Sequence, residues 1–140
     1  MDHNKLKIIS SQGIDQWNEY GKDLFKSYKK HWPKSLNLHL YTESFMDFPA
    51  EDQIIKIDLL DAGGSEYIKF IQDDSIWKRT KKFAHKAFSI IHALGNTHNG
   101  FLIWIDADVV TNKDINIDWL LNLCPTDCLT AHLGLNQFNP

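Results

Sequence analysis

The sequence contains little cysteine, a single arginine and no long hydrophobic run, and each shortage excludes a class of protein. Its 140 residues include 2 Cys, and the one arginine is Arg79. The longest strongly apolar run, Phe101–Ile105, is far shorter than the roughly 20 residues that a membrane-spanning helix requires. The amino terminus shows no apolar segment behind a basic start, as a secretion signal would. We therefore expect a cytoplasmic protein with reduced thiols and no transmembrane segment.

The chain also lacks an excess of basic residues, which argues against nucleic acid as a partner. It has 15 Lys and Arg against 18 Asp and Glu, a formal net charge of −3 and an isoelectric point near 6.1. Electrostatic binding of nucleic acid requires a broad basic surface instead. The length and the hydrophobic fraction of 43% are typical of a globular domain, so we expect residues 1–140 to form a single domain.

Sulfur and imidazole ligands do not occur at metal-binding spacings. Cys124 and Cys128 form a lone C-x3-C pair, and a zinc site would need further ligands. We expect both thiols to be small buried side chains beside a helix end. His85 and His92 are expected on one helix, where two surface histidines can fall on the same side by chance.

Short apolar strands alternate with amphipathic helices along the chain. The hydrophobic pattern predicts strands at residues 6–10, 36–41, 53–59, 101–105 and 128–132. Gly63-Gly64 is expected to end the third of these strands, and 65–77 to form a short helix or a turn. The alternation is typical of an α/β fold with a mainly parallel sheet. Because 101–105 is the most apolar strand, we expect it in the middle of the sheet, covered on both faces.

Three helices are expected between these strands. The first is capped by Asp15 and stopped by Pro33. The second spans 79–94. Its apolar stripe consists of Phe83, Ala87, Ile90, Ile91 and Leu94. A short third helix, 119–123, follows the cap Asp118.

Two aspartates, Asp106 and Asp108, directly follow the most apolar strand. Ligand crevices form at the carboxyl ends of parallel strands. In an extended chain, residues two apart point to the same side and lie about 6–7 Å apart. Two carboxylates at this spacing repel each other and favour a hard cation, Mg²⁺ or Mn²⁺, which completes its shell with phosphates and water. The pair therefore suits a metal–diphosphate ligand, and the alternative is two solvated turn residues.

The densest basic run, Lys78–Lys86, lies on the helix before this pair. Arg79, Lys82 and Lys86 share one helical face beside the apolar stripe. Their stems can lie along the sheet edge while the charged heads reach a crevice at the strand ends. A diphosphate would then meet cations from the metal and from this helix. The alternative is a solvated basic face without a ligand.

The segments FAHKAF (83–88) and FLIWIDADV (101–109) resemble the nucleotide-binding half of glycosyltransferases with the GT-A fold. In that family a strand ends in a D-x-D motif after a helix with basic residues. The resemblance is clearest over residues 77–121. It implies a Rossmann-like three-layer α/β sandwich with a mainly parallel central sheet. It also implies the transfer of a sugar from a nucleoside-diphosphate donor to an acceptor, which could be a glycan, a lipid or a protein.

The resemblance implies roles for individual residues. Asp108 would bind the Mn²⁺ or Mg²⁺ that bridges the two phosphates, and Asp106 would contact the ribose or the metal. Ser10 and Ser11, after the first strand, would lie against the base and the ribose. The basic face adds a hypothesis from the residues themselves: Lys86 or Arg79, with Lys82 beside them, binds the diphosphate and offsets the charge that grows on it as it departs.

The chain departs from the family in its length. Complete GT-A enzymes are longer, and their second half carries the acceptor pocket and the catalytic base or nucleophile. Because this sequence stops at Pro140, soon after Asp108, we expect the N-terminal part of a GT-A domain that is incomplete at its carboxyl end. His132, on the last expected strand, is most simply an ordinary strand residue, so no catalytic base is assigned.

Two other functions fit part of the pattern. Residues 105–110, IDADVV, also match the first motif of haloacid-dehalogenase-like phosphatases, D-x-D-x-[TV]. Asp106 would then be the nucleophile and Asp108 the general acid/base, with Mg²⁺ between them. Those enzymes need further downstream residues for which the chain has no room. The other alternative is a non-catalytic nucleotide-binding or interaction module, with its apolar surface covered by a partner or by self-association.

Overall fold

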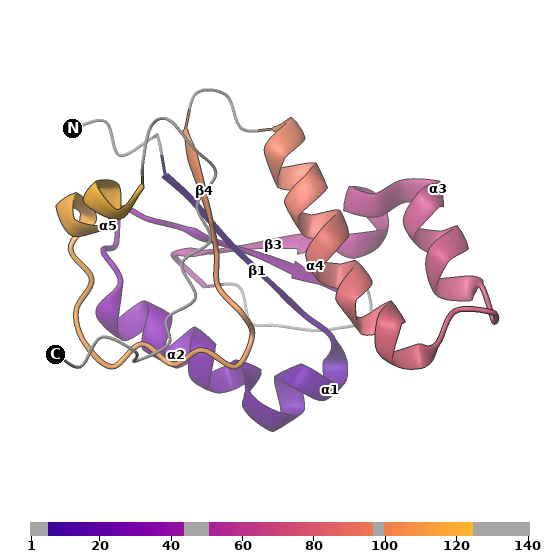
Figure 1. Cartoon of the computed structure of the whole chain (residues 1–140). Coiled ribbons are helices and arrows are strands. Elements are labelled where there is room, and N and C mark those ends of the chain that lie inside the picture. The colour runs from indigo at the N-terminus through magenta and orange to yellow at the C-terminus, as the bar shows by residue number, and fades with distance from the viewer. Residues whose placement is uncertain (1–5, 44–50, 97–99, 125–140) are drawn as a thin grey trace, which may run out of the picture.

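In the part of the chain that the structure describes, residues 6–43, 51–96 and 100–124, four parallel strands form one sheet. The strands of this computed structural model are β1 (Leu6–Gln12), β2 (Leu38–Thr42), β3 (Ile54–Asp58) and β4 (Phe101–Trp104). The helices are α1 (Ile14–Gln16), the π-helical segment η2 (Trp17–Gly21), α2 (Lys22–His31), α3 (Leu59–Gln72), α4 (Lys78–Gly95) and α5 (Ile117–Leu123) (Figure 1).

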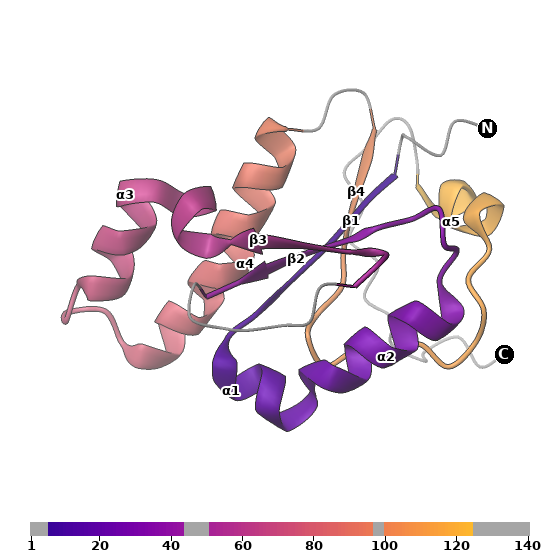
Figure 2. The ribbon, with the colours of Figure 1, turned by 180° about the vertical axis from the view of Figure 1, so that it is seen from behind.

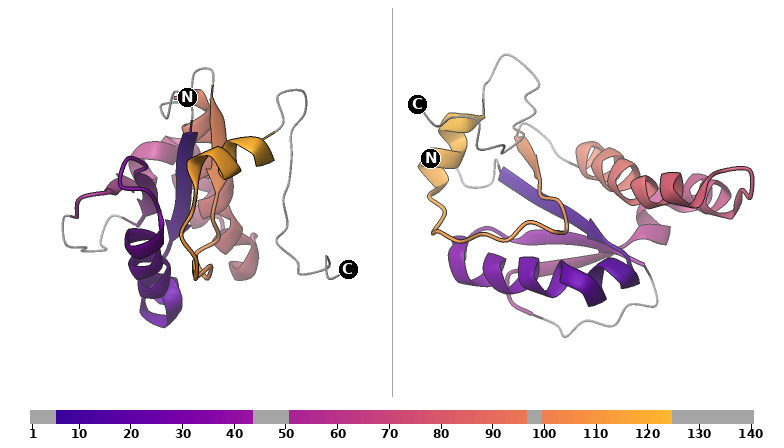
Figure 3. Two further views of the ribbon diagram at one scale, coloured as in Figure 1. Left: turned by 90° about the vertical axis from the view of Figure 1, so that its left-hand side faces the viewer. Right: turned by 60° about the horizontal axis from the view of Figure 1, so that its bottom comes forward.

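Helices cover both faces of the sheet, with α2 and α5 on one face and α3 and α4 on the other (Figures 1 and 2). Successive side chains of a strand point to opposite faces. In β1, Ile8 packs in the core beneath α2, and its neighbour Ile9 packs in the core beneath α4. Figure 3 shows the resulting helix–sheet–helix layers from the side. The prediction of an α/β fold with a parallel sheet is confirmed.

The expectation that residues 101–105 lie in the middle of the sheet is wrong among the described strands. The strand order is β3-β2-β1-β4, so β4 lies at an edge and β1 pairs on both sides. Helices nevertheless cover both faces of β4. Phe101 and Ile103 pack against the core beneath α2, and Leu102 and Trp104 against the core beneath α4. The apolar sequence of β4 therefore reflects two covered faces and not a central position.

The order of the strands reverses at β1. The chain places β2 and β3 on one side of β1 and then returns to place β4 on the other side. In open parallel sheets such a reversal leaves a crevice outside the carboxyl ends of the two strands that flank it. These strands are β1 and β4, and because they are parallel their carboxyl ends point to the same edge of the sheet.

Asp58, and not the glycine pair, ends the third strand. Its side chain accepts a hydrogen bond from the backbone N–H of Leu60 at 2.7 Å and so caps α3. Gly63 and Gly64 lie inside α3, where Gly64 has φ 55° and ψ −149° and kinks the helix. The predicted end of the strand at these glycines is therefore wrong. Much of the segment 65–77 is the second half of this kinked helix.

The prediction of a helix over 79–94 is confirmed by α4, but three large side chains of its predicted apolar stripe are exposed, whereas Ile90 packs against the core beneath α4. Phe83, Ile91 and Leu94 are 65%, 66% and 56% exposed. The buried positions of the helix hold small residues, namely Ala84, Ser89 and Ala93. Small side chains allow a helix to approach its neighbours closely. The helical period therefore identified the helix but not its buried face.

Two predicted helix caps lie elsewhere. The helical segment after β1 begins at Gly13 and not at Asp15, and the N–H of Gly13 donates to Gln16 Oε1 at 2.7 Å. Helix α5 is capped by Asn116, whose side chain accepts from the N–H of Trp119 at 3.1 Å, and not by Asp118. The N–H groups at the start of a helix lack partners within the helix, and a nearby side chain accepts from them. Here the accepting side chains are Gln16 and Asn116, and not the predicted aspartates. Trp32 is extended, which confirms the predicted stop before Pro33.

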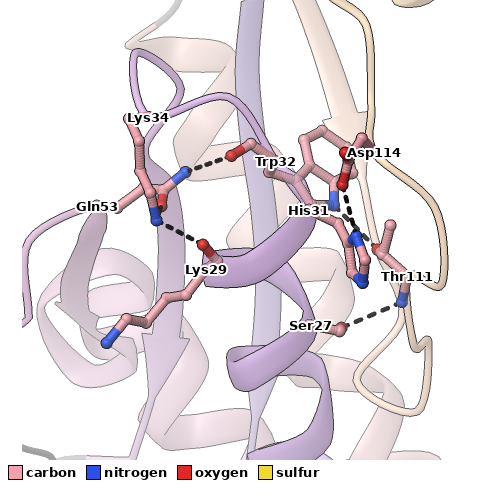
Figure 4. Close-up of polar contacts among 8 residues, drawn as sticks. All are labelled: Ser27, Lys29, His31, Trp32, Lys34, Gln53, Thr111 and Asp114. Atoms are coloured by element: carbon pink, nitrogen blue, oxygen red, sulfur yellow. Dashed lines mark hydrogen bonds and ion pairs between the residues drawn. The ribbon is translucent and has the colours of Figure 1, made fainter.

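Polar contacts tie the segment after β4 to the end of α2 (Figure 4). The N–H of Thr111 donates to Ser27 Oγ at 3.1 Å, and Trp32 Nε1 donates to Thr111 Oγ1 at 3.0 Å. His31 Nδ1 and Asp114 Oδ1 lie 2.7 Å apart. These contacts anchor the chain shortly after Asp106 and Asp108. Because β4 pairs with β1 before the two aspartates, the segment that carries them is held on both sides.

Some predictions concern residues that the structure does not describe. The expected strand at 128–132, with Cys128 and His132, lies outside the described residues. Cys124 follows α5 and is partly buried, and this burial raises the pKa of its thiol. Across residues 6–43, 51–96 and 100–124, no helix combines the length and the apolar character that a membrane crossing requires.

The kink in α3 generates a stability prediction. We expect Gly64→Ala to destabilise the protein by about 1–3 kcal/mol, because an alanine is strained at this positive φ although nothing within 4 Å obstructs its Cβ. Gly95→Ala is the matched control, since its Cβ also meets nothing within 4 Å and its φ is not in the left-handed region. Urea unfolding should show the control unchanged or slightly stabilised. Equal free energies of unfolding for the two variants would contradict the kink.

Candidate functional site

A cavity of about 350 Å³ lies at the carboxyl ends of β1 and β4, where the strand order reverses. Three segments line it. These are the end of β1 with the helical segment after it, the first half of α4, and the turn after β4. All three lie in the lower part of Figure 1. The cavity is thus at the edge of the sheet where open α/β folds bind ligands.

Most of the residues predicted for this site line the one cavity. They are Ser11, Arg79, Lys82, Lys86, Asp106 and Asp108. Ser10 does not line it. The alternation along β1 directs Ser10 with Ile8 toward the α2 side, where the buried Ser10 hydroxyl has no hydrogen-bond partner among the described residues. The serine pair is therefore divided between the two faces of the sheet.

The two aspartates lie in a turn and not in the extended chain that we expected. The N–H of Val109 donates to the backbone oxygen of Asp106 at 3.1 Å and closes the turn. The N–H of Ile105 still donates to the backbone oxygen of Ile9 at 2.9 Å, so pairing with β1 continues up to the residue before Asp106. Asp106 and Asp108 are exposed and both line the cavity. The turn, and not the strand period, brings them to the same site.

Two donors hold one oxygen of Asp106. Trp104 Nε1 donates to Asp106 Oδ1 at 2.5 Å, and Lys86 Nζ donates to the same oxygen at 3.0 Å. The Lys86 ammonium also lies 4.9 Å from the centroid of the Trp104 ring, within the range of a cation–π interaction. Asp106, Lys86 and Trp104 therefore form a connected group that joins α4 to the end of β4.

These contacts govern the charge of Asp106. Partial burial acts to raise the pKa of its carboxyl group. The hydrogen bonds from Trp104 and Lys86, together with the positive charge of Lys86, outweigh burial and hold the pKa below its usual value. Asp106 is consequently an anion at neutral pH.

The first half of α4 makes the opposite side of the cavity basic. Arg79 and Lys82 line it on the same helical face as Lys86, as their spacing predicted. The first turn of α4 contains no acidic residue, so nothing in that turn offsets the positive end of the helix dipole. The cavity therefore has an acidic side from the turn after β4 and a basic side from α4.

The segment after β1 closes the third side of the cavity. Gln16 and Tyr20 line it. Their helical segment packs tightly on β1, because a Cβ on Gly21 would lie only 2.3 Å from Gln12 Oε1. Gln12 Nε2 also donates to the backbone oxygen of Gly21 at 3.4 Å. The close approach at Gly21 holds the neighbouring Tyr20 at the cavity.

Four of the side chains that line the cavity were not among the residues predicted for the site, namely Gln16, Tyr20, Phe83 and Trp104. For Trp104 a signal existed. It lies two residues before Asp106, and the strand period directs such residues to the same side. For Gln16 and Tyr20 the signal is weaker, because it rests only on the start of a helix after β1. Phe83 belongs to the predicted apolar stripe of the helix, but it lies on the exposed side of α4 and lines the cavity.

His85 and His92 are partly buried and not on the surface as expected. His85 Nε2 lies 3.7 Å from Glu43 Oε1, and its side chain is 13% exposed. Burial lowers the pKa of His85, and the charge of Glu43 only partly opposes this. His92 Nδ1 lies 2.9 Å from the hydroxyl oxygen of Tyr41. Neither histidine lines the cavity.

The side chains at the cavity fit a hard cation only if waters and a phosphate ligand supply most of its coordination shell. Within residues 6–43, 51–96 and 100–124, no group of three or more His, Cys, Asp or Glu side chains could hold a metal ion. Asp106 and Asp108 nevertheless supply carboxylate oxygens to one cavity. Mg²⁺ is commonly bound by one or two carboxylates, with waters and substrate phosphates completing its shell. The donor set fits a metal that arrives with a phosphate ligand.

Comparison with known proteins adds no family assignment. No protein-family model matches the chain, and no match was found among curated proteins or solved structures.

The contacts of Asp106 predict a shift in its titration. Because its pKa is lowered in the folded protein, ionised Asp106 stabilises the fold above the unfolded-state pKa, and this contribution is lost as the pH falls through the folded-state pKa. Trp104→Phe removes one donor, so we expect the folded-state pKa of Asp106 to rise, its contribution to stability to become smaller, and the loss to be complete at a higher pH. An NMR titration of the Asp106 side-chain carboxyl carbon measures this shift.

Trp77→Phe is the matched control for this titration, because Trp77 is 68% exposed and does not line the cavity. It should leave the pKa of Asp106 as in the unaltered protein. The same Asp106 pKa in the unaltered protein and in Trp104→Phe would contradict the hydrogen bond.

Proposed function

We propose that the cavity between the ends of β1 and β4 binds a nucleoside-diphosphate sugar together with Mn²⁺ or Mg²⁺. On this proposal the chain is the donor-binding part of a GT-A glycosyltransferase. One observation carries the proposal. The D-x-D aspartates and three cationic side chains of α4 line the same cavity, at the point where the strand order reverses.

The distribution of charge favours a metal–diphosphate ligand. A diphosphate alone would be repelled by Asp106 and Asp108, and a divalent metal alone would be repelled by the cations of α4. A metal–diphosphate presents both charges at once, with its cation toward the aspartates and its oxygens toward the basic side. A volume of about 350 Å³ lies within the range of small-molecule sites.

Each side of the cavity has a role in this proposal. Asp106 and Asp108 hold the metal, which supplies Lewis-acid stabilisation of the charge on the departing diphosphate. Arg79 and Lys82 bind the phosphate oxygens, which Arg can do with two parallel hydrogen bonds. Ser11, on the far side of the cavity, lies nearer the ribose and base. The acceptor is a glycan, a lipid or a protein, and no residue is assigned as catalytic base.

Two side chains extend these roles beyond the sequence motifs. Tyr20 and Trp104 place aromatic groups at the cavity beside the serine and the aspartates, respectively. Aromatic faces stack on nucleobases and on the apolar faces of sugar rings. We assign Tyr20 to the nucleoside, since it lies on the same side of the cavity as Ser11.

Calorimetry tests the proposal. UDP, GDP, ADP and CDP are titrated into the protein with Mn²⁺ and in the presence of EDTA. We expect at least one of them to bind only with Mn²⁺. Asp108→Ala should weaken that binding at least tenfold, because it removes a carboxylate from the metal. Asp118→Ala is the matched control, an exposed aspartate on α5 that does not line the cavity, and it should bind like the unaltered protein.

Two outcomes would contradict the proposal. One is an affinity for every nucleotide that does not change when Mn²⁺ is removed. The same conclusion follows if Asp108→Ala binds every nucleotide as tightly as the unaltered protein does. The other is metal-dependent hydrolysis of an aryl phosphate that is lost in Asp106→Asn, because this would indicate a phosphatase that uses Asp106 as nucleophile.

A further inference from the structure

Lys86 occupies a defined position at the carboxylate that the proposed metal needs. Its ammonium donates to Asp106 Oδ1 at 3.0 Å and lies 4.9 Å from the centroid of the Trp104 ring. Trp104 Nε1 donates to the same oxygen. Lys86 is thus bound by a carboxylate and by an aromatic face, whereas many surface lysines extend into solvent.

The other cations of α4 do not share this contact. Lys82 and Arg79 line the same cavity, but in the described part of the chain neither forms an ion pair with Asp106. Arg79 instead lies 6.0 Å from the ring of Trp77. Lys86 therefore differs from its neighbours in its partner, although all three lie on one helical face.

Lys86 and a divalent metal compete for Asp106. Both are cations, and a metal on this carboxylate would face an ammonium that already donates to Oδ1. Like charges at such close range repel strongly. The side chain of lysine is a flexible four-carbon stem, so its ammonium can leave Oδ1 without any movement of α4. An anion at the basic side of the cavity supplies the new partner.

We propose that Lys86 is an exchangeable counter-ion, which pairs with Asp106 before a ligand binds and moves to the diphosphate when the metal binds. This inference rests on the proposed function, because it needs both a metal and a diphosphate at the cavity. Lys86 is a positioning and specificity residue in this account. It lowers the affinity for metal alone and makes metal and diphosphate bind cooperatively.

Cooperativity follows from linkage. A diphosphate that draws Lys86 away from Asp106 raises the affinity of the cavity for metal. By reciprocity, the metal raises the affinity for the diphosphate by the same factor. The cavity would therefore discriminate against free metal and against free nucleotide, and would favour the complex of the two.

Lys86→Met tests the exchange, because methionine keeps much of the stem and removes the charge. Mn²⁺ binding without nucleotide is followed by the EPR signal of free Mn²⁺. We expect Lys86→Met to bind Mn²⁺ about tenfold more tightly than the unaltered protein, and to bind the nucleoside diphosphate in saturating Mn²⁺ about tenfold more weakly, each an order of magnitude typical of losing one close charge contact. The factor by which Mn²⁺ raises the affinity for the nucleotide should fall toward one.

Lys82→Met is the charge-matched control. It removes the same charge from the same cavity but breaks no ion pair with Asp106. It should weaken nucleotide binding and change Mn²⁺ affinity without nucleotide much less than Lys86→Met does. Lys86→Gln serves as a second variant if the methionine is not tolerated, and circular dichroism shows which variants fold.

The failure of this inference differs from the failure of the proposed function. Suppose that the unaltered protein binds nucleotide only with Mn²⁺, but Lys86→Met binds Mn²⁺ no more tightly than the unaltered protein or than Lys82→Met. The exchange is then wrong, and the proposed function stands. If the unaltered protein binds neither Mn²⁺ nor nucleotide, the proposed function is wrong, and the exchange is wrong as well because it needs both ligands.

Discussion

The ion pair between Lys86 and Asp106 connects the two parts of the chain on which the cavity depends. Lys86 lies on α4 and Asp106 follows β4, with Trp104 Nε1 donating to the same carboxylate oxygen. Lys86 is the cation that contacts Asp106, while Arg79 and Lys82 line the same cavity. Partial burial acts to raise the pKa of Asp106, and the contacts of Trp104 and Lys86 outweigh it. On the proposed function, this anionic carboxylate is the ligand that a divalent metal would take.

The fold brings this pair to a place where a ligand can reach it. Because β1 pairs with both β2 and β4, the strand order reverses at β1 and leaves a crevice at the carboxyl ends of β1 and β4. Packing fixes the surroundings. The small buried residues of α4 let that helix lie close to its neighbours, and the close contact at Gly21 holds the helical segment after β1 against the strand. Contacts of Thr111 with Ser27 and Trp32 anchor the chain beyond the aspartates. Each lining segment is thus held by contacts outside the cavity.

Local patterns in the sequence predicted what depends on neighbours along the chain. The period of two identified the strands, the helical period identified α4, and helical spacing correctly placed Arg79, Lys82 and Lys86 on one face. A cavity does lie at the end of the apolar strand, where the sequence predicted a ligand crevice. What could not be predicted depends on partners distant in sequence. The edge position of β4 depends on how strands pair, and the outward face of Phe83 depends on α4 burying Ala84, Ser89 and Ala93 instead. Ser10 and Ser11 could not be separated until the faces of β1 were known. The contact of Trp104 with Asp106 required side-chain geometry.

We propose that Asp106 and Asp108 hold a divalent metal that in turn holds a diphosphate at the carboxyl ends of β1 and β4. The decisive measurement is anomalous diffraction from crystals grown with Mn²⁺ and a nucleoside diphosphate. We expect one manganese peak within coordinating distance of an aspartate oxygen of the D-x-D turn and beside the diphosphate, with the Lys86 ammonium moved from Asp106 onto a phosphate oxygen. A manganese peak away from this turn, or a nucleotide bound elsewhere on the protein, would contradict it.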